Sequence, residues 1–393
     1  MDRVQNPYRP GAGRRPPVLA GRAAILDAFD VVRRRAEQHG EGDRGWILNG
    51  LRGVGKTVLL TEMENVSEHG WITVKIEAGG PIPLAVSLTS EMVKALRTAT
   101  GRHPESNLRR LLGVFKAFSV KIDPSFGVNV GVDIAPITGV ADSGRFADDL
   151  YGLFEVLGET ARDLGIGALI LVDELQDGEA ADLRALTSAL HRLGQASVPL
   201  PIMFVGAGLP SLPAVLAEAN SYAERLYDYK AIGKLDDQGS RDALVIPAER
   251  LGVSWTPDGL REALTTATGY PYFLQAIGKH VWDLSVKSPI GLSDVELGLA
   301  AARKEVDAGL YRSRWDRATP AQRELMRTLA TIGIDDMASI ADLAKAMGKN
   351  RVTDLSVSRS ELIKKGLLYS PERGLLAFTV PGMDDFIQRL TET

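Results

Sequence analysis

Two short segments of the chain carry residue types that hold phosphate groups and a metal ion. The first, residues 46–57, is an apolar stretch that leads into Gly-x-x-x-x-Gly-Lys-Thr. Glycines let the backbone turn its N–H groups inward, and the start of a following helix adds further N–H groups that bind phosphate. The pattern predicts a P-loop in which Lys56 contacts the β- and γ-phosphates and Thr57 is a ligand of Mg²⁺. The predicted nucleotide contacts here are Gly50, Gly53, Val54, Gly55, Lys56, Thr57 and Val58.

The second segment, residues 168–174, reads Ala-Leu-Ile-Leu-Val-Asp-Glu. An apolar run that ends in Asp is typical of a buried parallel strand whose carboxylate emerges at the edge of the sheet beside the P-loop. Asp173 is predicted to hold Mg²⁺ through water, and Glu174 to polarise the attacking water as a general base. Together the two segments predict an enzyme that hydrolyses ATP to ADP and phosphate, with ATP or ADP and Mg²⁺ as cofactors.

Arg225 is a third candidate catalytic residue, just before the last predicted strand of the core. An arginine here can act in trans on the γ-phosphate of a neighbouring subunit, as an arginine finger does, which would require a homo-oligomer. A surface ion pair with Glu224 or Asp228 explains it equally well. For Gln176, shortly after the acidic pair, capping of the next helix is the favoured interpretation.

Composition limits the function classes. The 393 residues suffice for two or three domains, and a net charge of -4 excludes a generally basic nucleic-acid coat but not a local basic patch. The chain has no cysteine, which excludes a disulfide framework, a thiolate zinc site and a cysteine nucleophile. No apolar run approaches the ~18 residues of a membrane span. We therefore expect a cytoplasmic location and no membrane partner.

Strands alternate with helices through the first half of the chain. Apolar runs at 46–49, 71–76, 168–172, 201–205 and 227–232, with helical periodicity between them, predict an α/β fold in which helices sandwich a parallel sheet. A purely helical pattern follows. The predicted parts are an extended N-terminal arm at 1–17, a P-loop core at 18–235 with a β-hairpin insertion at about 117–135, a helical lid and linker at 236–317, and a winged helix at 318–393.

The winged helix is predicted from three helices followed by a hairpin, and basic residues outnumber acidic ones between 345 and 373. One interpretation places a helix in the major groove of double-stranded DNA and the wing on the backbone. The other is a protein-interaction or autoinhibitory module whose lysines form a solvated face. The candidate DNA contacts are Ser356, Ser358, Arg359, Lys364 and Arg373.

These motifs resemble the AAA+ and STAND branch of P-loop ATPases, above all archaeal-type ATPases, origin-recognition initiators and the Holliday-junction branch-migration motor. Residues 18–22, Val-Leu-Ala-Gly-Arg, resemble the Gly-Arg motif that lies near the adenine, which implies that Gly21 and Arg22 bind nucleotide. Residues 269–274, Gly-Tyr-Pro-Tyr-Phe-Leu, resemble the start of the lid helix that carries sensor 2, which implies a nucleotide contact for Pro271.

Two departures from that family pattern shape the expected function. The strand after the acidic pair ends in Gly206-Ala207-Gly208, where the family has a polar side chain, and Tyr272 stands where the lid supplies an arginine. The resemblance therefore implies slow hydrolysis coupled to conformational change rather than a fast motor. An AAA+-like ATPase associated with DNA is the first expectation. A STAND-type switch with a protein client and a nucleotide-bound transcription regulator are the alternatives.

Overall fold

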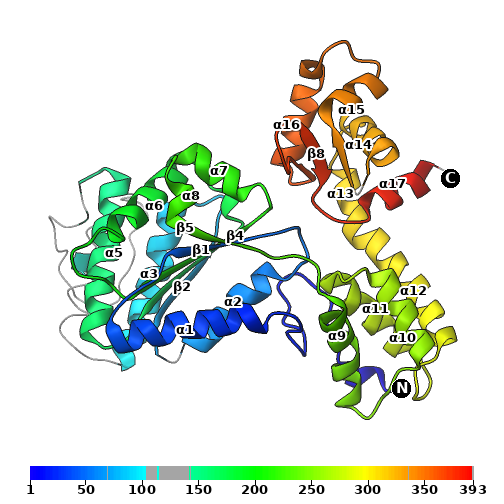
Figure 1. Ribbon diagram of the computed structural model, residues 1–393, viewed down its shortest axis with the longest axis horizontal. Helices are drawn as coiled ribbons and strands as arrows, with labels where there is room; N and C mark the ends of the chain where they lie inside the picture. The colour runs from blue at the N-terminus through cyan, green and yellow to red at the C-terminus, as the bar shows by residue number, and fades with distance from the viewer. Residues whose placement is uncertain (69, 103–112, 115–140, 142, 335, 392–393) are drawn as a thin grey trace.

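The N-terminal half of the protein is built on one parallel β-sheet (Figure 1). The structure is a computed structural model and describes residues 1–68, 70–102, 113–114, 141, 143–334 and 336–391. The β-hairpin predicted at 117–135 lies outside the described residues.

The five strands lie in the order β2-β3-β4-β1-β5, and every pairing is parallel. The central strands β3 and β4 are buried along their whole length, because helices cover both faces of the sheet. This confirms the predicted fold class. The carboxyl ends of β1 and β3 flank the end of β4, so the two predicted phosphate and metal segments meet at one edge. The strands are β1 Gly45–Asn49, β2 Ile72–Glu77, β3 Ala168–Asp173, β4 Ile202–Gly208 and β5 Tyr227–Ala231.

Alternate residues of each strand belong to two separate hydrophobic clusters, one on each face of the sheet, because successive side chains point to opposite faces. In β3, Leu169 and Leu171 pack with α1 and α2, whereas Ile170 packs with the helices of the other face. The helices of the core are α1 Ala23–His39, α2 Lys56–Ser67, α3 Leu84–Arg102, α5 Phe146–Asp163, α6 Ala180–Leu193, α7 Leu212–Ala219 and α8 Ala223–Leu226.

A helical lid follows the sheet. The Asp236 carboxylate accepts a hydrogen bond from Gly239 N at 2.7 Å and so caps the first lid helix, while Thr256 caps the second. Proline occupies the first position of the second and third helices, where its missing N–H costs nothing. The lid helices are α9 Asp237–Glu249, α10 Pro257–Ala267, α11 Pro271–Leu284 and α12 Leu292–Val306.

The N-terminal arm packs on this lid. A short 3-10 helix, Arg3–Gln5, is followed by Tyr8, which is buried against Gly278 and donates its hydroxyl hydrogen to Leu244 O. Trp282 Nε1 donates to Asp2 O at 2.9 Å. Figure 1 shows the amino terminus beside the lid, although the lid residues that it contacts lie more than 200 positions later in the sequence.

The C-terminal domain has the helices and antiparallel strands of a winged helix. Its three strands pair in the order β6-β8-β7. Strand β6 and helix α17 were not predicted from the sequence, because β6 is only three residues long and α17 follows the last strand almost directly. The elements are α14 Pro320–Ile332, β6 Met337–Ser339, α15 Ile340–Ala346, α16 Ser356–Lys364, β7 Leu368–Tyr369, β8 Leu375–Phe378 and α17 Met383–Thr391, and α13 Arg312–Asp316 precedes them.

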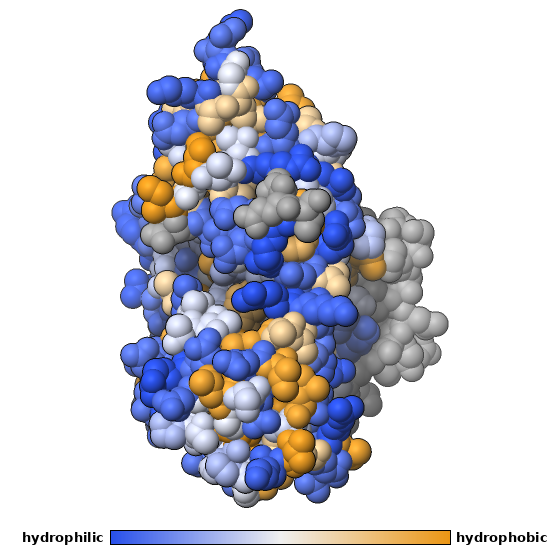
Figure 2. Space-filling view, turned by 90° about the vertical axis from the view of Figure 1, so that its right-hand side faces the viewer, coloured by the Kyte–Doolittle hydropathy of each residue, from blue (hydrophilic) through white to orange (hydrophobic). Residues whose placement is uncertain are grey.

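Figure 2 views the face that the winged-helix domain and the lid share, and hydrophobic residues gather on its lower half, over the lid. Large apolar side chains that the lid exposes include Leu284, Val286, Leu292 and Leu297. Within the described ranges, no helix combines the length and the apolar composition that crossing a membrane requires.

Candidate nucleotide site

The P-loop follows β1 and depends on its glycines. Gly53 and Gly55 have φ angles of 85° and 96°, in the left-handed region that other residues rarely adopt. A Cβ on Gly50 would lie 2.1 Å from Ile232 O, so this position has no room for a side chain. Helix α2 begins at Lys56, directly after the loop, and the N–H groups of its first turn, which have no acceptor within the helix, could bind a phosphate.

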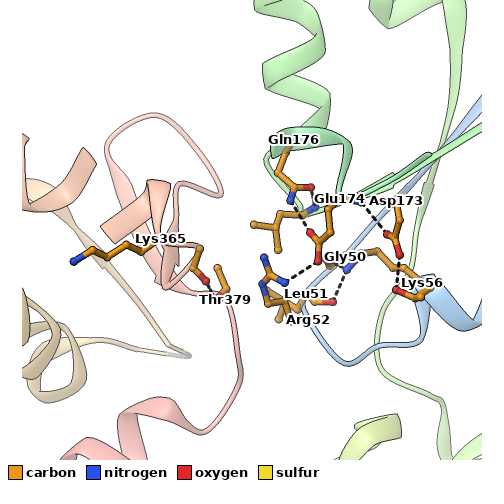
Figure 3. A network of polar contacts seen from close by, with 12 residues as sticks. Gly50, Leu51, Arg52, Lys56, Asp173, Glu174, Gln176, Lys365 and Thr379 are labelled. Atoms are coloured by element: carbon orange, nitrogen blue, oxygen red, sulfur yellow. Dashed lines mark hydrogen bonds and ion pairs between the residues drawn. The ribbon is translucent and has the colours of Figure 1, made fainter. Parts of the chain in front are cut away.

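Lys56 is buried in the loop (Figure 3). Its Nζ donates to Gly50 O at 2.8 Å and to Leu51 O at 2.9 Å, the carbonyl oxygens of the loop itself. Burial lowers the pKa of Lys56 to about 8, although the nearby carboxylates of Glu174 and Asp173 oppose this shift. A bound phosphate would supply the negative charge that this desolvated ammonium lacks.

The two predicted magnesium ligands lie in contact. Thr57 Oγ1 donates to Asp173 Oδ2 at 2.6 Å, and the other Asp173 oxygen accepts from Glu174 N at 2.9 Å. In the part of the chain that the structure describes, no group of three or more His, Cys, Asp or Glu side chains is arranged so that it could hold a metal ion. One hydroxyl and one carboxylate nevertheless suit Mg²⁺, which takes oxygen ligands and completes its shell with water and substrate phosphates. The donor set therefore fits the predicted ion.

Both carboxylate oxygens of Glu174 are engaged. Arg52 Nη1 donates to Oε1 at 2.7 Å, and Gln176 Nε2 donates to Oε2 at 2.6 Å (Figure 3). The backbone of Glu174 is left-handed, with φ 47° and ψ 38°, which is a strained conformation for a residue with a side chain. In this arrangement both oxygens of the candidate base already accept hydrogen bonds from neighbouring side chains.

Gln176 supplies a polar group where the end of β4 has none. Its Oε1 accepts from Leu209 N at 2.9 Å, and a Cβ on Gly208 would lie 2.3 Å from that oxygen. Gly208 therefore leaves room for the Gln176 side chain. The capping interpretation of Gln176 was wrong, because α6 begins after Glu179 without any side-chain cap. A glycine at the strand end was the sequence signal that could have indicated this contact.

The P-loop also contacts the lid and the winged-helix domain through Arg52. Arg52 N donates to Thr379 O at 3.2 Å, and Tyr270 donates its hydroxyl hydrogen to Arg52 O. A Cβ on Gly366 would lie 3.1 Å from Arg52 Nη2. Thr379 is held in turn by its Oγ1, which donates to Gly366 O at 2.8 Å. One P-loop residue thus touches all three parts of the molecule.

The Gly-Arg motif joins the core to the lid. Arg22 Nη2 donates to Val54 O at 3.0 Å and to Gly233 O at 2.6 Å. Gly21 has a φ of 64°, and a Cβ there would lie 3.0 Å from a methyl group of Leu235. The motif therefore fixes where the chain leaves the sheet for the lid.

A cavity of about 460 Å³ lies between the P-loop, the lid, the arm and the segment before the winged helix. Its volume suits a nucleotide-sized ligand. Of the predicted nucleotide contacts, Gly21 and Gly50 lie outside the lining, as does Asp173. The arm lines the cavity from residue 9 to residue 16 except for Arg15, and residues 18–20 of the core continue this wall. Predicted site residues in the lining are Arg22, Gly53, Val54, Gly55, Lys56, Thr57, Val58, Glu174 and Pro271.

The charge of this lining is strongly positive. Six cationic side chains face one carboxylate, that of Glu174, and such an excess favours a polyanion. The cations are Arg9, Arg14, Arg22, Arg52, Lys56 and Arg314.

Arg225 lies away from this cavity. It is an exposed residue of α8, and Asp228, one of its expected partners, instead pairs with Lys230 at 2.8 Å. No ion pair involves Arg225 among the residues that the structure describes. Its action in trans stays a prediction.

The candidate DNA contacts lie on α16 and on the turn between β7 and β8. Ser356, Lys364 and Arg373 are exposed, whereas Ser358 and Arg359 are half-buried. Arg373 lies in the β7–β8 turn, at the predicted tip of the wing. Helix α16 lies on the side of its domain that is turned toward the sheet (Figure 1), and its end leads into Gly366 beside Arg52.

Comparisons with known proteins place this geometry in a fold class. A Walker-type ATPase of Pyrococcus abyssi is 14% identical, covers 97% of this chain and 98% of its own, and has a TM-score of 0.62. The ORC2 protein of Aeropyrum pernix in its ADP form is 15% identical, covers 100% and 99%, and has a TM-score of 0.55. At such identities the likeness concerns the fold alone. The chain has the fold of AAA+ P-loop ATPases, which confirms the predicted resemblance to archaeal-type and origin-recognition ATPases.

Three further comparisons give no additional information about the function. A RuvB variant of Thermotoga maritima, 14% identical over 96% of this chain and 98% of its own, has a TM-score of 0.47, too low to carry an argument. Residues 308–387 match the model of a domain of unknown function, DUF8462. No curated protein matches the sequence.

Proposed function

We propose that this protein binds Mg-ATP, hydrolyses it slowly, and uses the nucleotide to change the contact between its winged-helix domain and its P-loop. The observation that carries the proposal is the position of Arg52. Its side chain pairs with Glu174, and its backbone N–H donates a hydrogen bond to Thr379 O of the winged-helix domain. A change at the catalytic carboxylate and a change at the domain contact therefore involve the same residue.

The proposal assigns a residue to each step of the chemistry. Lys56 and the start of α2 would bind the phosphates, and Thr57 with Asp173 would hold Mg²⁺, which would neutralise charge on the phosphates. Glu174 takes the proton of the attacking water only after Arg52 releases it. This requirement for release supports slow turnover.

Binding and turnover of the full-length protein test the proposal. Calorimetric titration with Mg-ADP and with a non-hydrolysable ATP analogue should give saturable binding at one site. Glu174→Gln should bind both nucleotides like the wild type while phosphate release falls at least ~100-fold, as expected for a lost general base. An unchanged rate in Glu174→Gln would show that Glu174 is not the base, and absence of any binding would refute the proposal.

Association with double-stranded DNA is a second candidate function. The observation in its favour is that Lys364 and Arg373 are exposed at the end of α16 and in the β7–β8 turn. Fluorescence anisotropy with duplex DNA at several salt concentrations should give a log–log slope that shrinks by about one with each of Lys364→Ala and Arg373→Ala. Absence of DNA binding with ATP, with ADP and without nucleotide would favour the switch with a protein client instead.

A further inference from the structure

Arg314 lines the nucleotide cavity from the segment that joins the lid to the winged-helix domain. The segment continues from α12 through a π-helical turn, Asp307–Tyr311, into α13. Figure 1 shows it running from the lid to the C-terminal domain. Gly309 and Leu310 of the same turn also line the cavity. Arg314 therefore lies at the nucleotide cavity and at the base of the winged helix.

The positive charge and the hydrogen-bond donors of the Arg314 guanidinium have few partners among the described residues. Nη1 donates to Leu310 O at 2.9 Å, but Nε is buried without a hydrogen-bond partner among the described residues. Burial lowers the pKa of Arg314, and the neighbouring cations Arg52 and Arg317 lower it further. A half-buried cation beside other cations is unfavourable in the free protein, and an anion in the cavity would offset that cost.

The other arginines of the lining are placed differently. Arg22 donates to two backbone carbonyl groups and its charge is stabilised by the Asp236 carboxylate, and Arg52 pairs with Glu174. Arg9 and Arg14 lie on the arm and are exposed to solvent. Arg314 is thus the half-buried guanidinium of the described lining whose charge no carboxylate meets.

We propose that Arg314 binds the terminal phosphate of ATP and links this phosphate to the winged-helix domain. The link runs through the end of α13, where Arg317 Nη2 donates to Lys365 O at 3.0 Å and Lys365 Nζ donates to Arg317 O at 2.9 Å. Movement of Arg314 toward a phosphate would therefore shift Arg317 and, through these two hydrogen bonds, Lys365 at the end of α16. The proposal rests on the proposed function, Mg-ATP binding in this cavity.

Calorimetric titration of the full-length protein with AMP-PNP and, separately, with ADP tests the proposal, because only AMP-PNP carries a third phosphate. Arg314→Ala should weaken AMP-PNP binding at least ~10-fold and ADP binding less than about threefold, as expected for one charge-assisted contact to the terminal phosphate. Arg314→Met, which keeps the aliphatic part of the side chain, should do the same. Arg312→Ala removes an exposed arginine from the same helix and should leave both affinities unchanged.

Melting temperatures without nucleotide show whether the variants fold, and Arg314→Met replaces Arg314→Ala if alanine destabilises the segment. Equal affinities of wild type and Arg314→Met for AMP-PNP would overturn the proposal, and so would an equal loss for both nucleotides, which indicates a structural role. If the wild type binds neither nucleotide, the proposed function fails and this proposal falls with it. If the wild type binds both and only the Arg314 prediction fails, the proposed function stands.

Discussion

Arg52 Nη1 lies 2.7 Å from Glu174 Oε1 and donates a hydrogen bond to it. The backbone N–H of Arg52 donates to Thr379 O of the winged-helix domain at 3.2 Å. The candidate general base and the C-terminal domain are therefore joined through a single P-loop residue (Figure 3). Because the pair is only partly exposed, at 29% for Arg52 and 19% for Glu174, water screens it less than a surface ion pair.

Removal of this arginine should release the base. We expect Arg52→Ala to raise the rate of phosphate release about 3- to 10-fold, because Glu174 loses the cation that competes with water for its oxygen. Steady-state phosphate release at saturating ATP measures the change. Arg33→Ala, which breaks a surface pair with Asp30 and Glu37, is the control and should leave the rate as it is. A slower Arg52→Ala enzyme would contradict the restraining role.

Loss of the P-loop lysine should abolish nucleotide binding and leave the fold intact. Lys56→Ala removes the ammonium that contacts the β- and γ-phosphates, and we expect ATP affinity to fall at least ~100-fold. Circular dichroism should show unchanged secondary structure, since the acceptors of Lys56 Nζ among the described residues are carbonyl groups of its own loop. Calorimetric titration that finds wild-type affinity in Lys56→Ala would place the nucleotide elsewhere.

The affinity for ATP should fall in alkaline solution. Burial lowers the pKa of Lys56 to about 8 in the free protein, whereas a bound phosphate raises that pKa by favouring the charged ammonium. Below pH 8 both states carry the proton and the affinity is constant. Above pH 8 binding must take up a proton, so the affinity declines, by at most about tenfold per pH unit. Titrations between pH 7 and pH 9.5 check this, and a flat profile would contradict the buried, depressed lysine.

Asp336 should make stability depend on pH. Burial first, and then the neighbouring Asp384 and Asp385, together raise its pKa to about 7, against one backbone hydrogen bond from Gly382. Between its ordinary value of 3.8 and 7, the folded state keeps a proton that the unfolded state has lost. The stabilising contribution is therefore complete below pH 3.8 and lost as pH rises through 7.

Asp336→Asn removes this titration. At pH 8 we expect the variant to be more stable than the wild type by about 1–2 kcal/mol, after allowance for the partial exposure of the group. Chemical denaturation at pH 5 and pH 8 measures the difference, which should shrink at the lower pH. Asp27→Asn changes an exposed aspartate of α1 and serves as the control. Equal stabilities of Asp336→Asn and wild type at pH 8 would contradict the raised pKa.

Arg225 should affect ATP hydrolysis only at the site of a neighbouring subunit. It is exposed and lies outside its own cavity, so Arg225→Ala should bind ATP normally yet hydrolyse it at least ~10-fold more slowly if it completes a neighbouring site. Mixing Arg225→Ala with Glu174→Gln tests this directly, because a mixed assembly pairs an intact arginine with an intact base. Partial recovery of phosphate release supports the prediction, and wild-type activity of Arg225→Ala alone would sink it.

The sequence by itself determined the α/β class and the chemistry of the P-loop and of Asp173-Glu174. These features depend on local patterns, since a buried strand needs an apolar run and a phosphate loop needs glycines in fixed positions. The same reasoning placed the C-terminal helices and the turn at Arg373, but missed β6, which is only three residues long, and α17, although its apolar residues recur at helical spacing at Met383, Phe386, Ile387 and Leu390.

Tertiary structure decided what surrounds that chemistry. The arm packs on the lid and lines the cavity, Gln176 fills the space beside Gly208, and Arg52 joins Glu174 to Thr379. Arg314 reaches the same cavity from a segment more than 250 residues beyond the P-loop. These contacts join residues that are far apart in the chain through packing and charge compensation. Local sequence periodicity does not predict such contacts, because only the folded arrangement of core, lid and winged helix brings the residues together.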